Sequence, residues 1–178
     1  KDKVKCPAVV LLDADPGESA KGRTGKTLIS EAVGEVRKLY TIDGKSYDNR
    51  KSFRFSGMDL GTSVILFDDV KRKFDFEALY SIITTGITIE KKYKDAIHLP
   101  FEKTPKVIIT TNYALIGEGS SFNARAHEFE ISNTFSDSYT PVDKYKKRFF
   151  EDWNNEEWNL FYNLITQSNS GQYYSCYQ

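Results

Sequence analysis

Residues 22–27, Gly22-Arg23-Thr24-Gly25-Lys26-Thr27, are the stretch on which the fold prediction rests. An apolar run, Ala8 to Leu12, precedes them and is typical of a buried strand. Downstream, apolar residues recur at the spacing of an amphipathic helix up to Leu39. A glycine-containing turn between a strand and a helix presents backbone N–H groups and the positive end of the helix dipole to an anion. The sequence therefore predicts a phosphate-binding loop.

Each residue of this loop has a predicted task. Residues 22–25 form the backbone cradle, Lys26 reaches the β- and γ-phosphates of a nucleotide, and the Thr27 hydroxyl ligates Mg²⁺. The usual first glycine falls at Ala20, and the loop that begins at Asp13 is longer than usual, with Gly17 as a candidate start of an extended turn. The alternative is an ordinary helix amino terminus that binds nothing.

A second predicted strand ends in two adjacent carboxylates, Val64-Ile65-Leu66-Phe67-Asp68-Asp69. Two acidic groups after an apolar run are costly unless a cation or polar partners satisfy them. Asp68 is predicted to hold Mg²⁺, directly or through water, and Asp69 to orient and deprotonate an attacking water molecule. The alternative is a solvated acidic pair at an exposed strand end.

A third buried strand, Lys106 to Thr111, delivers the side-chain amide of Asn112 at its carboxyl end. Ligands of open α/β sheets bind at the carboxyl ends of the strands, so Asn112 is predicted to contact the γ-phosphate or the attacking water. The alternative is a simple turn-capping asparagine.

Two short runs, residues 87–90 and 96–99, flank the sequence Lys91-Lys92-Tyr93-Lys94-Asp95 and predict a β-hairpin with a basic tip. A solvated tip without a ligand is the alternative. Buried strands that alternate with helices predict an α/β fold with a mostly parallel sheet flanked by helices. We divide the chain into a core, residues 1–141, and a C-terminal helical segment with a loose tail, residues 142–178. An aromatic face is predicted on this segment, formed by Tyr145, Phe149, Trp153, Trp158 and Phe161, and we expect the stripe from Phe149 to Phe161 to be a packed core face.

Composition argues against a protein of overall basic charge, a membrane-spanning protein and a disulfide-rich protein. The 25 basic and 25 acidic residues balance, so any contact with nucleic acid must come from a local patch. No apolar stretch has the length of a membrane span, and we expect no membrane partner. Cys6 and Cys176 have no metal-binding spacing, so we expect no disulfide framework and a reducing, cytoplasmic setting in a bacterial or virus-infected cell.

Four of these segments, in order, resemble the superfamily 3 helicases, the AAA+ ring helicases of small DNA viruses, phages and mobile elements, including the primase-helicase type. They are Gly-Arg-Thr-Gly-Lys-Thr at 22–27, Ile-Leu-Phe-Asp-Asp at 65–69, Thr-Ile-Glu-Lys-Lys-Tyr-Lys at 88–94 and Val-Ile-Ile-Thr-Thr-Asn at 107–112. The resemblance runs from about residue 9 to residue 125. Similarity to the phage primase-helicase branch continues in the aromatic residues of the C-terminal segment.

The resemblance implies an AAA+ domain with a protruding hairpin, ATP and Mg²⁺ as cofactors, and a homo-hexameric ring. It implies that Lys92 and Tyr93, with Lys94 beside them, contact single-stranded DNA in the ring channel. Arg125 falls where these proteins carry an arginine finger that acts on the nucleotide of the neighbouring subunit; a surface salt bridge is the alternative for this residue. An origin-binding or primase domain is expected on the N-terminal side of a longer chain.

The resulting hypothesis is an ATP-driven DNA helicase motor that acts on single-stranded DNA or a replication fork. A second hypothesis is a P-loop ATPase that remodels or loads proteins without unwinding DNA. A third is a small-molecule kinase, which would need no arginine supplied by a neighbour. The basic, aromatic hairpin tip favours the first hypothesis.

Overall fold

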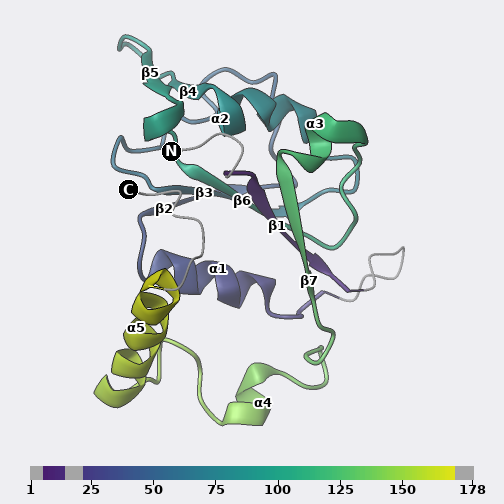
Figure 1. The fold of residues 1–178 in the computed structure, drawn as a ribbon, viewed down its shortest axis with the longest axis vertical. Helices are drawn as coiled ribbons and strands as arrows, with labels where there is room; N and C mark the ends of the chain where they lie inside the picture. The colour runs from purple at the N-terminus through teal and green to yellow at the C-terminus, as the bar shows by residue number, and fades with distance from the viewer. Residues whose placement is uncertain (1–5, 15–21, 171–178) are drawn as a thin grey trace.

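The computed structural model describes residues 6–14 and 22–170, which form a five-stranded, fully parallel sheet in the order β2-β3-β6-β1-β7 (Figure 1). The predicted α/β fold with a mostly parallel sheet flanked by helices is thereby confirmed. The three inner strands are the apolar runs identified in the sequence. The strand bounds are Ala8–Asp13 for β1, Leu39–Asp43 for β2, Val64–Val70 for β3, Lys106–Thr111 for β6 and Ala126–Ile131 for β7.

Helices cover both faces of the sheet. Helix α1, Lys26–Gly34, lies on one face, where Val33 packs over a small cluster that contains Leu11 and Leu66 (Figure 1). The other face carries the larger core, into which Leu79 and Phe122 pack. This core is covered by a 3₁₀ turn and two short helices, η2 (Glu77–Leu79), α2 (Tyr80–Thr84) and α3 (Gly119–Asn123).

One predicted boundary is wrong. The apolar spacing predicts a helix that continues to Leu39, but α1 ends at Gly34 and Leu39 begins strand β2. Tyr40 and Ile42 of β2 pack against the larger core, and Leu39 packs on the α1 side. Pairing with β3 therefore overrides the helical spacing, because a strand satisfies its backbone groups and places alternate side chains on the two faces.

The predicted hairpin is present. Strands β4 (Gly86–Ile89) and β5 (Ile97–Pro100) pair antiparallel, with the 3₁₀ turn η3, Phe101–Lys103, immediately after them. The hairpin projects from the end of the molecule opposite α1 (Figure 1). At its tip Tyr93 has a left-handed backbone, with φ of 58°, and its side chain is fully exposed.

The C-terminal segment contains helices α4 (Pro141–Tyr145) and α5 (Asn155–Ser170). A capping box, in which Thr140 and Asp143 bind each other's backbone N–H, fixes the start of α4. The predicted aromatic residues pack on one another, for example Trp153 and Trp158 with ring centroids 5.2 Å apart. The expectation of a core face is wrong in one respect, since these rings are only half-buried or exposed and belong to neither core cluster.

Two ion pairs join the parts of this segment. Arg148 binds Asp152 with an Nη2–Oδ1 distance of 2.9 Å, and Lys147 binds Glu157 with an Nζ–Oε1 distance of 2.7 Å. The hydrogen bond from Arg148 lowers the pKa of Asp152 below its ordinary 3.8, and the one from Lys147 lowers the pKa of Glu157 below its ordinary 4.5. Because the folded pKa values are depressed, these pairs stabilise the segment above about pH 4.5 and lose that contribution as the pH falls through the folded values.

The chain offers a direct readout of this acid sensitivity. Its two tryptophans, Trp153 and Trp158, both belong to the aromatic cluster, so intrinsic tryptophan fluorescence reports on the C-terminal segment alone. We expect the emission maximum to move to longer wavelength as the pH falls below about 4.5, before the sheet unfolds by circular dichroism. An emission maximum that stays constant until the sheet itself unfolds would contradict this expectation.

Cys6 is buried and disulfide-bonded, which corrects the expectation of no disulfide framework at this residue; Cys176 lies outside the described residues. In the part of the chain that the structure describes, no helix is long and apolar enough to cross a bilayer.

Candidate functional site

The phosphate-binding loop predicted at residues 22–27 leads directly into α1. Gly22, Arg23 and Gly25 have positive φ values of 61°, 55° and 104°, and Gly25 is the amino-terminal cap of the helix. Positive φ values turn the backbone away from regular structure and are accessible to glycine at little cost. Ala20 and Gly17, which bear on the unusual length of the loop, lie outside the described residues.

A buried polar cluster lies at the base of this loop. Thr24 and Lys26 are 7% and 8% exposed, and both side chains bind Oδ1 of Asp13, which is 5% exposed at the carboxyl end of β1. The Thr24 hydroxyl donates over 2.6 Å, and the Lys26 ammonium also donates to that hydroxyl over 3.2 Å. Lys26 therefore has an anionic partner inside the chain, which the sequence analysis did not foresee.

The acidic pair lies within β3 rather than after it. The pairing of β3 with β6 shifts register between Phe67 and Val70, and Asp69 there has a left-handed φ of 52°. Thr110 of β6 holds both acidic residues, because its hydroxyl donates to Asp68 Oδ1 over 2.6 Å and accepts from the Asp69 backbone N–H over 2.7 Å. The irregularity turns two successive carboxylates towards one edge of the sheet, although side chains of a regular strand alternate between faces.

The carboxylate of Asp69 is held from two sides. Asn112 donates to its Oδ1 over 3.3 Å, and Lys45, from the turn after β2, forms an ion pair with its Oδ2. That turn is fixed against β3, because Gly44 donates its N–H to the Asp68 carbonyl over 2.7 Å and has no room for a Cβ atom. The hydrogen bond to Asp69 raises the pKa of Lys45 above its ordinary 10.5, so the lysine stays charged at neutral pH.

These groups surround a single cavity of about 470 Å³ at the carboxyl edge of the sheet. Such an edge is the expected ligand site of an open parallel sheet. The cavity gathers the loop, the acidic pair and the asparagine, which lie up to 90 positions apart in the sequence. Its lining consists of Gly22, Arg23, Thr24, Gly25, Lys26, Thr27, Asp68, Asp69, Thr110 and Asn112.

The cavity suits a phosphate group with its cation. Lys26 and the amino end of α1 supply positive charge for phosphate oxygens. Thr27 and Asp68 carry oxygen atoms of the kind that bind Mg²⁺ in proteins. Within the described residues no group of three or more metal-ligating side chains occurs.

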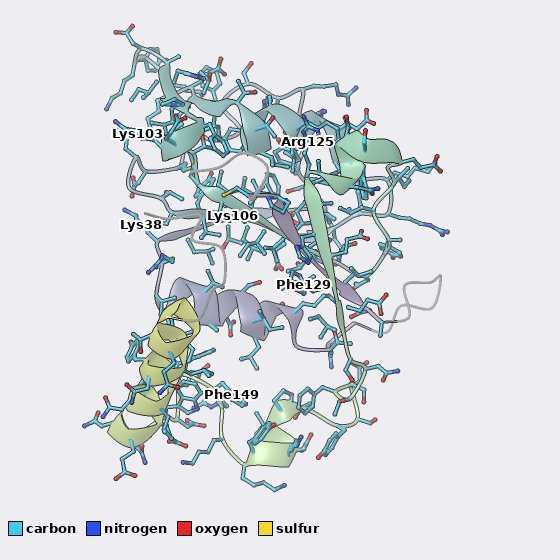
Figure 2. The ribbon with its side chains drawn as sticks, in the orientation of Figure 1. Lys38, Lys103, Lys106, Arg125, Phe129 and Phe149 are labelled. Carbon is cyan, nitrogen blue, oxygen red and sulfur yellow. The ribbon has the colours of Figure 1, made fainter. Side chains whose placement is uncertain are left out.

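Two further predicted groups lie away from this cavity. Arg125 directly precedes β7 at the amino edge of the sheet, where its carbonyl accepts the N–H of Ala8 over 2.7 Å (Figure 2). Its guanidinium lies over the ring of Tyr80, 4.7 Å from the centroid, and Nη1 donates to the Ser121 carbonyl over 2.9 Å. The surface salt bridge considered for Arg125 is therefore not formed with any described residue. The hairpin tip with Lys92, Tyr93 and Lys94 likewise contributes nothing to the lining of the cavity.

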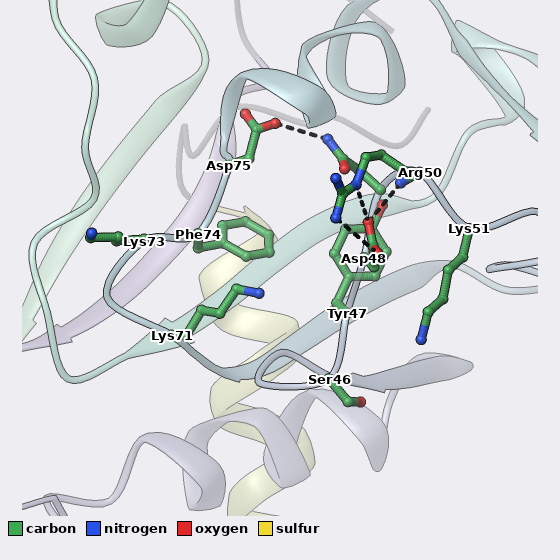
Figure 3. A pocket seen from close by; sticks show the side chains of 10 residues that line it. Ser46, Tyr47, Asp48, Arg50, Lys51, Lys71, Lys73, Phe74 and Asp75 are labelled. Atoms are coloured by element: carbon green, nitrogen blue, oxygen red, sulfur yellow. Dashed lines mark hydrogen bonds and ion pairs between the residues drawn. The ribbon is translucent and has the colours of Figure 1, made fainter.

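A second cavity, of about 500 Å³, lies between the loop after β2 and the segment after β3 (Figure 3). Arg50 is paired with Asp48, and Asn49 donates to Asp75 over 2.8 Å, so these polar groups satisfy one another. None of the residues predicted for the site lines this second cavity.

Sequence reasoning missed three residues of the site: Asp13, Lys45 and Thr110. Thr110 carried a usable signal, because it lies two positions before Asn112 and its side chain must face the same side of the strand. Asp13 carried a weaker one, as a carboxylate that directly follows an apolar strand. Lys45 carried none, since its contact with Asp69 depends on the pairing of β2 with β3.

Comparison with known proteins is consistent with this fold. The NrS-1 C-terminal region, in its apo A form, has a TM-score of 0.52 and 14% identity, with 91% of this chain and 35% of that chain covered. The JCV helicase, solved with a thiazolopyridine-phenoxyphenyl acetamide bound, has a TM-score of 0.52 and 11% identity, with 92% and 51% covered. At these identities the likeness shows only that this chain shares the fold of the two structures.

The chain spans about a third and a half of the lengths of these two structures. No curated protein matches it significantly. The model of a family described as "Family of unknown function (DUF5906)" matches residues 18–125, which include every residue of the cavity. The chain therefore belongs to the family of unknown function DUF5906.

Proposed function

We propose that this chain is the ATP-dependent motor domain of a DNA helicase that works in viral, phage or mobile-element replication. One observation carries the proposal: Lys26, Thr27, Asp68, Asp69 and Asn112 line one cavity at the carboxyl edge of a parallel sheet. A phosphate-binding loop opposite an acidic strand end and a polar amide is the arrangement that nucleotide hydrolysis requires. The helicase-type fold agrees with it.

The residues divide the chemistry among them. Thr27 and Asp68 would hold Mg²⁺, which supplies positive charge at the phosphates when bound. Lys26 donates to phosphate oxygens and stabilises the charge that develops during transfer. Asp69 accepts the proton of the attacking water, and Asn112, already bonded to Asp69, orients that water.

Arg125 is proposed to serve the nucleotide of a neighbouring subunit in a homo-hexameric ring. The Arg125 guanidinium must then leave the aromatic ring of Tyr80 when the hexamer assembles. While it is stacked on Tyr80 of its own chain, it cannot reach the nucleotide of a neighbouring subunit. In this proposal residues 1–141 form the motor and residues 142–178 an appended helical segment.

The hairpin tip is proposed as the grip on single-stranded DNA. Lys92 supplies charge for a phosphate, and the exposed ring of Tyr93 supplies a stacking surface for a base or sugar. The left-handed backbone at Tyr93 holds the residue at the apex of the turn, clear of the sheet. This tip favours the helicase over a protein-remodelling ATPase, the second candidate, because a lysine beside an exposed ring suits a phosphate and a base.

The test is ATP hydrolysis with and without single-stranded DNA, for the wild-type chain in its full-length protein and for the double variant Lys92→Ala/Tyr93→Ala. We expect DNA to stimulate the wild type and to leave the variant at its basal rate, because loss of one stacked base and one phosphate contact removes about 1–3 kcal/mol of DNA binding. Lys103→Ala, at an exposed lysine beyond the base of the hairpin, is the matched control and should respond like the wild type. Hydrolysis that is indifferent to DNA in all three proteins would favour the remodelling ATPase.

A further inference from the structure

Asp13 is a buried carboxylate to which the proposed mechanism gives no task. It ends strand β1, and it shares the face of Leu11, which packs on the side of the sheet covered by α1. That face leads to the first turn of α1, where Lys26 begins the helix. The strand thus delivers a negative charge to the phosphate-binding loop itself.

The contacts of Asp13 form a closed set. Its Oδ1 accepts from the Thr24 hydroxyl and from the Lys26 ammonium, and these two donors also bind each other. All three side chains are more than nine-tenths buried. Its Oδ2 is buried and has no hydrogen-bond partner among the described residues. Asp13 is therefore held by the loop alone, with Lys26 as its one cationic partner among those residues.

Neither charge of this pair can stand alone. A buried ammonium or carboxylate without a counter-ion is strongly destabilising, whereas a well-paired one is tolerated. Lys26 therefore needs an anion whenever no phosphate is bound, and Asp13 provides it. When phosphate reaches the same ammonium, two negative charges compete for one positive charge and also repel each other across a poorly solvated site.

We propose that Asp13 is a positioning residue that serves as the built-in counter-ion of Lys26 in the nucleotide-free protein and competes with the incoming phosphate. This inference rests on the proposed function, because it requires that the loop bind a nucleotide. Asp13 stabilises the nucleotide-free loop and weakens nucleotide binding. It thereby favours release of ADP, because Lys26 can return to Asp13 when the phosphates leave.

The test variant is Asp13→Asn, which keeps the size of the side chain and an oxygen acceptor for Thr24 but removes the charge. The probe is ADP with Mg²⁺, and the readouts are the dissociation constant by titration calorimetry and the melting temperature of the free protein. We expect the free protein to melt lower by roughly 6–20 °C, because Lys26 loses its buried counter-ion. We expect Mg-ADP to bind more tightly by about five- to tenfold, since phosphate then becomes the only anion for Lys26.

Asp137→Asn is the matched control. Asp137 is an exposed carboxylate that pairs with Arg23 of the phosphate-binding loop, with 3.1 Å between its Oδ1 and the Arg23 Nε. It does not touch Lys26. Removal of this surface charge should change the Mg-ADP affinity by less than about twofold. If the Asp13→Asn chain does not fold, Asp13→Ser gives a second neutral side chain and must show the same tightening.

The outcomes separate the two proposals. Wild-type protein that binds Mg-ADP, together with an Asp13→Asn variant of equal or weaker affinity, overturns the counter-ion role and leaves the proposed function intact. Wild-type protein that does not bind Mg-ADP, and that behaves like Lys26→Ala, overturns the proposed function and the inference together. A lower melting temperature together with tighter Mg-ADP binding supports the inference. If Asp13 only supported the local fold, its replacement would lower both the melting temperature and the affinity for Mg-ADP.

Discussion

Asp69→Asn is expected to reduce ATP hydrolysis by about 10²–10⁴-fold while nucleotide binding survives. The asparagine keeps the shape of the side chain and can still contact Asn112 and Lys45, but it cannot accept a proton from water. Binding is expected to survive because the proposed mechanism assigns the phosphates to the loop and Lys26, which also line the cavity, and not to Asp69. The measurement pairs steady-state phosphate release with the dissociation constant for Mg-ADP.

The control for this variant is Asp59→Asn. Asp59 is an exposed carboxylate paired with Lys38 and does not line the cavity, so its hydrolysis should equal that of the wild type. Hydrolysis by Asp69→Asn within threefold of the wild type would remove Asp69 from the role of proton acceptor. Loss of binding together with hydrolysis would show instead that Asp69 shapes the cavity.

Phe67→Ala is expected to lower the free energy of unfolding by about 3–5 kcal/mol. Phe67 is completely buried in β3, directly before the acidic pair. Its ring packs edge-on against Tyr47 with centroids 4.9 Å apart and lies 5.8 Å from Phe74. Its loss leaves a cavity beneath the strand that carries Asp68 and Asp69. The measurement is chemical denaturation followed by circular dichroism.

Leu60→Ala provides the comparison, because Leu60 is an apolar residue that is 57% exposed. Its replacement should change stability by no more than about 0.5 kcal/mol. Equal costs for the two variants would mean that Phe67 does not lie in the core. A folded Phe67→Ala protein is also expected to bind nucleotide less tightly, since the acidic pair loses its support.

The local sequence was sufficient for the elements whose periodicity and end signals agree. Strands β1, β3 and β6 are short apolar runs that no solvated loop would contain, and the hairpin is two such runs around a polar turn. The loop before α1 was predictable because glycines between a strand and a helix can adopt the positive φ values that a phosphate-binding turn requires. Local sequence was insufficient at Leu39. The helical spacing of apolar residues continues to this position, but Leu39 begins strand β2, which pairs with β3.

Local signals also predicted part of the site, namely the residues that line its cavity. Lys26, Thr27, Asp68, Asp69 and Asn112 follow from one rule, that parallel strands end at the same edge of a sheet. Their roles in binding and hydrolysis stay predictions that the proposed experiments test. Cys6 shows the limit of this reasoning, because nothing in the spacing of the cysteines predicted that it is disulfide-bonded.

The sequence by itself determined which residue types meet at the carboxyl edge of the sheet, because strand, loop and helix signals are local and the parallel arrangement brings their ends together. Only the tertiary structure decided how these residues are paired. Asp13 holds Lys26, Lys45 and Asn112 hold Asp69, and Thr110 links the two acidic residues. At the opposite edge, the guanidinium of Arg125 lies over the ring of Tyr80. The physical reason is that each pairing depends on the register between strands and on the path of a turn. These are set by packing of the whole core rather than by the residues on either side.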